Sequence, residues 1–206
     1  MKNFYFEKVK RIQTLAEIGL EFSENSFDSE RYKEIHEISL QMLEQMTDIP
    51  VKKIIPVIAE KDGYKTPKVD VRAVVFNDKG KILLVQEKAD NRWSMPGGWS
   101  DISYSPGEVA EKECMEEAGL EVKAKKLLAV IDKQKQNMPP AFEYTYKILL
   151  LCEKLGSNIS TGSETKDAGW FFEDELPELS TPRNNRKMIQ MMFEYYRGER
   201  SEPYFD

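Results

Sequence analysis

The sequence predicts an α/β sandwich that follows a small all-α N-terminal domain. Residues 4–61 carry apolar side chains at helical spacings, whereas from Val69 onward short apolar runs separated by turn signals indicate strands. One helix, at about 106–118, interrupts these strands, and another, at about 182–197, follows them. This order favours a sheet with helices packed on its faces. We therefore divide the chain into a helical domain (1–62), a linker (63–68) and an α/β domain (69–206).

Three helices are expected in the N-terminal domain. The first has apolar residues between Val9 and Leu20, mostly three or four positions apart. The second follows Asp28 as its candidate N-cap. The third runs from about Val51 to Glu60 and contains Pro56, where we expect a kink or break because proline removes a helical hydrogen bond.

The α/β domain is expected to contain at least five strands. The turn Asn77–Gly80 separates the first two, which predicts a hairpin. The expected strands are residues 69–76, 81–86, 122–131, 143–152 and 168–172.

Composition excludes several classes of protein. The 206 residues carry a formal net charge of −6, so no global basic field attracts nucleic acid, and no dedicated nucleic-acid binding is expected. The longest apolar run, Ile148–Cys152, is too short to span a bilayer. Without a signal-peptide pattern, a cytoplasmic protein without membrane partners is expected. Cys114 and Cys152 fall in predicted core positions and are read as small apolar residues rather than a disulfide.

The helix at about 106–118 has readable ends. Ser105 is a suitable N-cap, Pro106 suits the first helical position, and Glu108 completes a capping box with Ser105. Gly119 suits the position after the C-terminus, where the backbone is often left-handed.

Three carboxylates share one face of this helix. Glu113, Glu116 and Glu117 lie within an arc of about 100°, and like charges at these spacings cost roughly 0.2–0.5 kcal/mol per pair. Glu116 and Glu117 also lie in the last turn, where the helix dipole disfavours negative charge. A solvated acidic face is the simple interpretation. A Gly-Gly loop before the helix favours the other, a site for a hard cation such as Mg²⁺ with a phosphorylated substrate.

The stretch from Gly98 to Leu120 resembles the Nudix box, G-x5-E-x7-R-E-U-x-E-E-x-G-U, in which U is a bulky apolar residue. Two positions depart from it: the first glutamate falls on Tyr104 and the arginine on Lys112. In the family both side chains support the metal-binding glutamates. The support is therefore rebuilt, with the Tyr104 hydroxyl or ring near Lys112 as one arrangement, or the box has decayed. The intact positions favour the first reading: Gly98, Glu113, Glu116, Glu117, Gly119 and Leu120.

The resemblance covers about residues 67–200 and implies a Nudix α/β/α sandwich with a mixed sheet. It implies hydrolysis of the pyrophosphate bond in a nucleoside diphosphate linked to another moiety, with Mg²⁺ or Mn²⁺ as cofactor. The helical front end resembles, in general shape, a bacterial subgroup that includes ADP-ribose and CDP-choline pyrophosphatases. Because this segment is too small to bury its apolar stripes alone, we expect it to form a homodimer or to cover an active site of a neighbouring subunit.

The resemblance also implies roles for individual residues. Glu113 and Glu117 are the expected direct metal ligands, and Glu116 is a ligand or a water-orienting base. Glu164 precedes Trp170 by six positions and is the candidate extra ligand or general base, with Asp167 as competitor and an ordinary loop acid as the alternative.

Substrate binding is assigned to Arg72, Arg92 and Gly98. Arg72 could instead pair with a carboxylate, a role that is slightly favoured, and Gly98 permits close backbone approach. Trp93 could contact a base, although a core role is favoured. The aromatic side chains between 142 and 146 could stack on a base or simply pack: Phe142, Tyr144 and Tyr146.

Two further functions compete with the enzyme. The altered Tyr104 and Lys112 positions motivate a catalytically silent ligand sensor that signals through the helical region. A Nudix enzyme that processes RNA is the other alternative, and the acidic balance of the chain counts against it.

Overall fold

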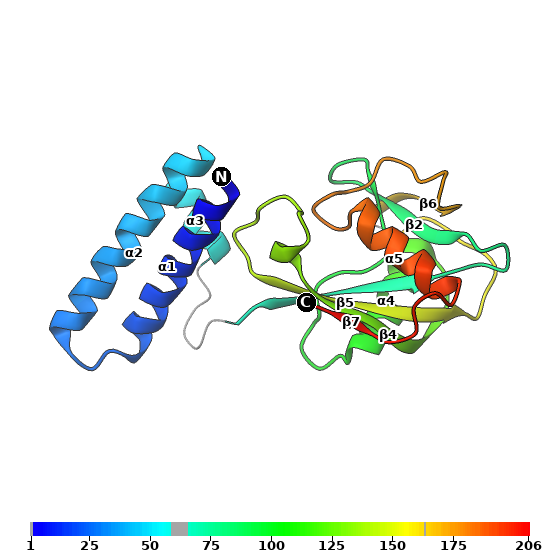
Figure 1. Cartoon of the computed structure of the whole chain (residues 1–206), viewed down its shortest axis with the longest axis horizontal. Coiled ribbons are helices and arrows are strands. Elements are labelled where there is room, and N and C mark those ends of the chain that lie inside the picture. Colours follow the sequence, from blue (N-terminus) through cyan, green and yellow to red (C-terminus); the bar gives the residue numbers. More distant parts are fainter. Residues whose placement is uncertain (1, 59–65, 163) are drawn as a thin grey trace. The chain divides into compact units, whose positions relative to one another are not determined.

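The computed structural model describes residues 2–58, 66–162 and 164–206 (Figure 1). It divides into two compact units: one comprises Met1–Pro67 with Pro140–Tyr144, and the other comprises Lys68–Pro139 with Thr145–Asp206. Half of the expected linker, residues 63–65, lies outside the described residues. Within the described part, no helix is long and apolar enough to cross a membrane.

The helical unit contains α1 (Lys2–Phe22), α2 (Ser26–Thr47) and α3 (Val51–Ile58). α1 and α2 form a hairpin (Figure 1). Its second helix begins earlier than expected, because the side chain of Asn25 accepts the Phe27 amide and caps α2, while Asp28 lies in the first turn. α3 continues past Pro56 to Ile58, and the end expected at Glu60 lies outside the described residues.

The core of the helical unit is small. Among the described residues, a cluster of buried apolar side chains joins the three helices: Phe6, Val9, Leu40, Leu43 and Ile54. Phe142, from the Pro140–Tyr144 segment, packs against this cluster. Phe142 and Tyr144 therefore do not share a strand face with Tyr146. The strand that was expected from residue 143 begins at Thr145.

The α/β unit contains two sheets. The first has the order β1-β5-β4-β7, with β1 parallel to β5 and β5 antiparallel to β4, so it is a mixed sheet. The second has the order β3-β2-β6 and is antiparallel. The strands are β1 (Lys68–Val75), β2 (Ile82–Glu87), β3 (Trp93–Ser94), β4 (Val122–Asp132), β5 (Thr145–Lys154), β6 (Thr165–Phe171) and β7 (Tyr204–Phe205).

The predicted hairpin of β1 and β2 is wrong. The two strands lie in different sheets, and Phe76 and Ile82 form only an isolated bridge where the chain turns between them. The reason is their burial: Ala73–Val75 and Ile82–Val85 are fully buried, so each strand is covered on both faces. A two-stranded hairpin with one solvated face does not give that burial pattern.

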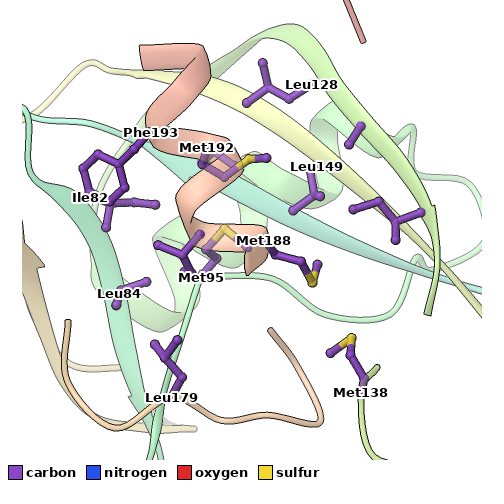
Figure 2. Close-up of a cluster of buried hydrophobic side chains, with 14 residues drawn as sticks. Ile82, Leu84, Met95, Leu128, Met138, Leu149, Leu179, Met188, Met192 and Phe193 are labelled. Carbon is purple, nitrogen blue, oxygen red and sulfur yellow. The ribbon is translucent and has the colours of Figure 1, made fainter. Parts of the chain in front are cut away.

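Two helices cover opposite faces of this arrangement. α4 (Pro106–Ala118) packs over one cluster with alternate residues of β1 and β2, such as Ala73 and Leu83. α5 (Arg186–Tyr196) packs over the other: in Figure 2 its Met188, Met192 and Phe193 lie among side chains of the strands, with Val74 in the same cluster. The predicted fold class, a helical pair followed by an α/β domain with a mixed sheet, is confirmed.

Candidate functional site

α4 has the ends that its sequence predicts. The Ser105 hydroxyl accepts the Glu108 amide while the Glu108 carboxylate accepts from the Ser105 amide, and Pro106 occupies the first turn. Gly119 follows the helix in a left-handed conformation, with φ of +60°. The small side chains Ala110, Cys114 and Ala118 are fully buried, which brings the backbone of α4 close to the strands. Both cysteines are free and buried, as expected.

The Trp93–Gly98 segment passes beside α4 and is fixed by side chains from β1, from α4 and from the segment before α5. The Glu117 carboxylate accepts the Gly97 amide at 2.9 Å. The Met95 carbonyl accepts from Arg72 Nη1 at 3.0 Å, and the Met95 amide donates to Asn184 Oδ1 at 2.7 Å. Gly97 has a φ of +146°, and a Cβ there would lie 2.0 Å from the Val71 carbonyl oxygen, so only glycine fits this close approach.

A cavity of about 480 Å³ opens between this segment, α4 and the chain before α5. Its wall contains both signs of charge. The lining residues are Asp70, Arg72, Glu87, Gly97, Gly98, Trp99, Asp101, Glu113, Glu117, Lys133, Thr145, Glu164, Pro182 and Arg183.

The structure brings most of the candidate site residues to this cavity. Arg72, Gly98, Glu113, Glu117 and Glu164 line it. They come from β1, the glycine turn, α4 and the residue just before β6, which are distant in sequence. As the side chains stand, the described residues include no group of three acidic, histidine or cysteine side chains at metal-binding spacing. The carboxylates line one cavity rather than form a closed cluster.

Two candidate residues are not among those lining the cavity. Glu116 is more than half exposed and pairs with Lys112 at 3.2 Å. Arg92 lies at the turn between β2 and β3, where it pairs with Glu178 at 2.8 Å. Asp167, the competitor of Glu164, lies on β6 and its carboxylate accepts the Ala168 amide.

Lys112, at the arginine position of the box, is surrounded by carboxylates. Its Nζ lies 3.7 Å from Asp101, 3.7 Å from Glu113 and 3.2 Å from Glu116. Asp101 stands beside Lys112, and the side chain of Tyr104 is about half exposed. A cation next to the box glutamates is therefore retained, with a different neighbour from the one expected.

Charge at the α4 carboxylates is poorly compensated. Burial raises the pKa of Glu117 to about 7, and the negative charges of Glu87 and Glu113 add to the increase. The hydrogen bond from the Gly97 amide and the positive charge of Arg72 lower this pKa, but they do not outweigh burial. Burial also raises the pKa of Glu113, with Glu116 and Glu164 contributing in the same direction and Lys112 opposing. Both carboxylates would be stabilised by a cation in the cavity.

A buried charge cluster under the cavity was not expected from sequence. Asp70 Oδ1 accepts from Arg72 Nε at 2.8 Å and from Lys147 Nζ at 2.9 Å. Burial alone would raise the pKa of Asp70, but Arg72 and Lys147 outweigh it and lower the value to about 2. Arg72 thus pairs with a carboxylate, the role favoured from sequence. Lys147 was missed because only the parallel register of β1 and β5, which pairs Asp70 with Lys147, brings them together.

Arg183 was also missed. It lies in the irregular segment before α5, where no periodicity marks its direction, and the sequence was read as helical from 182. The structure starts α5 at Arg186, with Asn185 as its N-cap, because Ser180 and Asn184 are bonded to Trp93 and Met95 instead.

Comparisons with known proteins agree with this fold. Residues 66–192 match the family model of the NUDIX domain, and residues 5–58 match that of the UDP-X-like N-terminal oligomerisation domain. The protein "Putative ADP-ribose pyrophosphatase YjhB" of Bacillus subtilis (strain 168) is 39% identical over 98% of this chain and 97% of its own.

Two solved structures are similar. A crystal structure of an ADP-ribose pyrophosphatase from Streptococcus suis is 42% identical and has a TM-score of 0.62, covering 68% of this chain and 100% of that one. A crystal structure of a UDP-X diphosphatase is 32% identical, has a TM-score of 0.64 and covers 100% of both chains. With its box helix, its mixed sheet and a family match over most of its length, the chain is a member of the Nudix hydrolase family.

Proposed function

We propose that this chain hydrolyses the pyrophosphate bond of a nucleoside diphosphate linked to another moiety, with ADP-ribose as the first candidate substrate. One observation carries the proposal: Glu113, Glu117 and Glu164 line a single cavity beside the Gly97–Gly98 turn. Its volume of about 480 Å³ falls within the usual range of small-molecule sites.

The donor set of the cavity fits a divalent cation such as Mg²⁺ or Mn²⁺, which Nudix enzymes typically use. Carboxylate oxygens are the ligands that such hard cations prefer, and burial raises the pKa values of Glu113 and Glu117, so that a bound cation would stabilise their charged forms. We assign the ion to Glu113 and Glu117, with Glu164 facing them. Glu116 could join only after leaving Lys112. A bound ion would neutralise charge on the diphosphate and acidify a water molecule.

The other residues of the site hold this arrangement. The Gly97 amide orients the Glu117 carboxylate, and Lys112 lies beside Glu113 and Glu116. Arg72 is almost fully buried and donates to Asp70 and to the Met95 carbonyl, so its role is to fix the glycine turn. Glu164 is the candidate general base that takes a proton from the attacking water.

The relatives favour two substrates. ADP-ribose is supported by two relatives that are named as ADP-ribose pyrophosphatases, YjhB and the Streptococcus suis protein. A UDP-linked substrate is supported by the UDP-X diphosphatase, whose structure matches along the whole chain. CDP-choline stays a prediction from the resemblance of the helical front end.

The test is turnover with Mg²⁺ or Mn²⁺ on ADP-ribose, UDP-linked sugars, CDP-choline and a short 5′-triphosphate RNA. We expect release of a nucleoside monophosphate from ADP-ribose or a UDP-linked sugar. Glu117→Gln should lower kcat at least about a hundredfold, because it removes a charge that acts at the reacting centre. Asp167→Asn is the matched control, since Asp167 does not line the cavity, and it should retain activity.

Tight binding of one member without turnover would contradict the proposal and support the ligand sensor. Turnover confined to RNA would support the alternative of RNA processing. Equal activity of Glu117→Gln and the native protein would show that the metal site is misassigned.

We also propose that the helical unit makes the protein a homodimer. α1 and α2 each expose a second apolar stripe beside the one that faces their common core: Ile12, Leu15 and Phe22 on α1, and Ile35, Ile38 and Met42 on α2. Patches of this kind mark protein interfaces, and the segment matches a domain model described as one for oligomerisation.

A further inference from the structure

One arginine in the cavity wall has a more constrained setting than its position in a loop predicts. Arg183 lies three residues before α5, and its side chain is 28% exposed. It lines the cavity together with Glu113, Glu117 and Glu164. An arginine in an ordinary loop would extend into solvent, where its charge is fully hydrated.

Two edges of the Arg183 guanidinium are held by side chains of the α/β unit. Nε lies 2.9 Å from Glu87 Oε1, and the same oxygen accepts from the Ser94 hydroxyl at 2.6 Å. Nη1 donates to Ser180 Oγ at 3.0 Å and lies 3.6 Å from Asp90 Oδ2. Since the planar guanidinium has fixed donor directions, these contacts determine where its third nitrogen points.

That third nitrogen, Nη2, is left for another partner. No hydrogen bond from Nη2 is present among the residues that the structure describes. Ordering a long side chain costs conformational entropy, and here that cost is already met in the folded protein. A ligand oxygen in the cavity would therefore meet a preorganised donor.

The backbone around Arg183 is fixed to the Trp93–Gly98 segment. Asn184 accepts the Met95 amide at 2.7 Å and donates to the Trp93 carbonyl at 3.3 Å, and the Ser180 amide donates to the same Trp93 carbonyl at 2.8 Å. Near the other end of this segment, the Gly97 amide donates to the Glu117 carboxylate. Arg183 and the α4 carboxylates are thus positioned against one common segment.

We propose that Arg183 is a substrate-binding residue, which donates from Nη2 to a phosphoryl oxygen of the substrate's diphosphate. This inference rests on the proposed function. Glu113, Glu117 and Glu164 are acceptors that need a cation between themselves and a phosphate, whereas a guanidinium binds a phosphoryl oxygen directly. Arg183 therefore takes the direct phosphate contact that the sequence assigned to Arg92.

The test compares Arg183→Gln and Arg183→Lys with the native protein and with the matched control Arg186→Gln. Arg186 is three residues further on and exposed, so its variant makes the same change of charge outside the cavity. We measure the Kd of ADP and of adenosine by calorimetry in Mg²⁺, the KM and kcat on the substrate of the turnover panel, and the melting temperature.

Arg183→Gln should raise the Kd of ADP and the KM about tenfold, as expected for the loss of a charge-assisted hydrogen bond. The Kd of adenosine, which has no phosphate, should stay unchanged, and so should all values for Arg186→Gln. Arg183→Lys should recover only part of the loss, since an ammonium cannot keep the contacts with Glu87 and Ser180 while reaching the cavity.

Unchanged ADP binding in Arg183→Gln would overturn the inference. So would equal losses for ADP and adenosine, which would indicate a disturbed loop, or failure of the native protein to bind ADP. If the native protein binds ADP but turns over no member of the panel, the proposed function fails while the two binding constants still decide the role of Arg183.

Discussion

Glu117 is the single residue whose surroundings are least suited to its charge. It is 6% exposed, and its neighbours in the cavity wall include Glu87 and Glu113. Because burial raises its pKa to about 7, the metal-free protein favours the protonated form up to neutral pH. Without a cation, this residue of the proposed cation site therefore destabilises the fold at neutral pH.

The stability of the metal-free protein should reflect this carboxylate. Between the ordinary pKa of 4.5 and the folded value of about 7, the folded state binds more protons than the unfolded one, so the free energy of unfolding falls as pH rises and then levels off. A difference of one in pKa corresponds to about 1.4 kcal/mol, so Glu117 should account for a loss of about 3 kcal/mol.

Urea denaturation in EDTA at pH 5 and pH 7.5 measures this loss. Glu117→Gln keeps an oxygen for the Gly97 amide but cannot titrate, so its loss of stability over the same interval, which spans most of the titration, should be smaller by about 2 kcal/mol. Identical losses in the two proteins would mean that Glu117 ionises normally in the fold.

Residues within one helix could be predicted, and residues joined by tertiary structure could not. The positions of Glu113 and Glu117 follow from helical periodicity alone. Lys147 meets Asp70 only through the register of two strands, and Arg183 enters the cavity only because the irregular segment around it is bonded to Trp93 and Met95. Neither position carries a periodic signal in the sequence.

At the scale of elements, the C-terminus of α4 is joined to the chain segment that carries Glu164. The Ala118 carbonyl accepts the Ser160 amide at 2.8 Å, and the Glu117 carbonyl accepts the Thr165 hydroxyl at 2.7 Å. These contacts satisfy carbonyls that a helix end leaves without partners. They also fix Glu164 relative to Glu117, although the two residues are far apart in sequence.

Gly162 lies where this segment and the C-terminus of α4 approach each other very closely. A Cβ there would lie 1.6 Å from the Glu116 carbonyl oxygen, so Gly162→Ala must push the segment away from α4. We expect a loss of about 1–3 kcal/mol, which lowers the melting temperature by about 2–4 °C per kcal/mol, together with a lower kcat as Glu164 moves.

Gly156→Ala is the control in the same connection, because its Cβ would meet only Leu120 at an ordinary 3.8 Å. Melting curves and turnover of the two variants decide the question. If Gly162→Ala behaves like Gly156→Ala, the contacts between the C-terminus of α4 and this segment do not position Glu164.

At the scale of the whole molecule, the two units differ in how completely they bury their apolar residues. The α/β unit has two large clusters, one under each of α4 and α5. The helical unit has one small cluster and leaves side chains such as Leu15 and Ile38 about half exposed. This difference is the physical reason to expect a second copy on α1 and α2.

The double substitution Leu15→Glu and Ile38→Glu tests that expectation. Charges in the middle of the two apolar stripes should convert a dimer to a monomer in sedimentation velocity, because a buried unpaired carboxylate is strongly disfavoured. Leu155→Glu is the control, as Leu155 is similarly exposed but lies in the α/β unit. A native protein that sediments as a monomer, or a double variant that remains dimeric, would contradict the proposal.

The separation of β1 from β2 has a consequence for how the chain reaches this fold. The turn at Asn77–Gly80 makes a local hairpin quick to form, yet the native partner of Lys68 is Thr145. Closing so long a loop costs entropy before any ladder bond compensates for it, which slows folding. The β1 edge therefore stays available for wrong pairing until β5 reaches it, and the rate of refolding should be set by this late parallel pair rather than by α4, whose backbone hydrogen bonds are local.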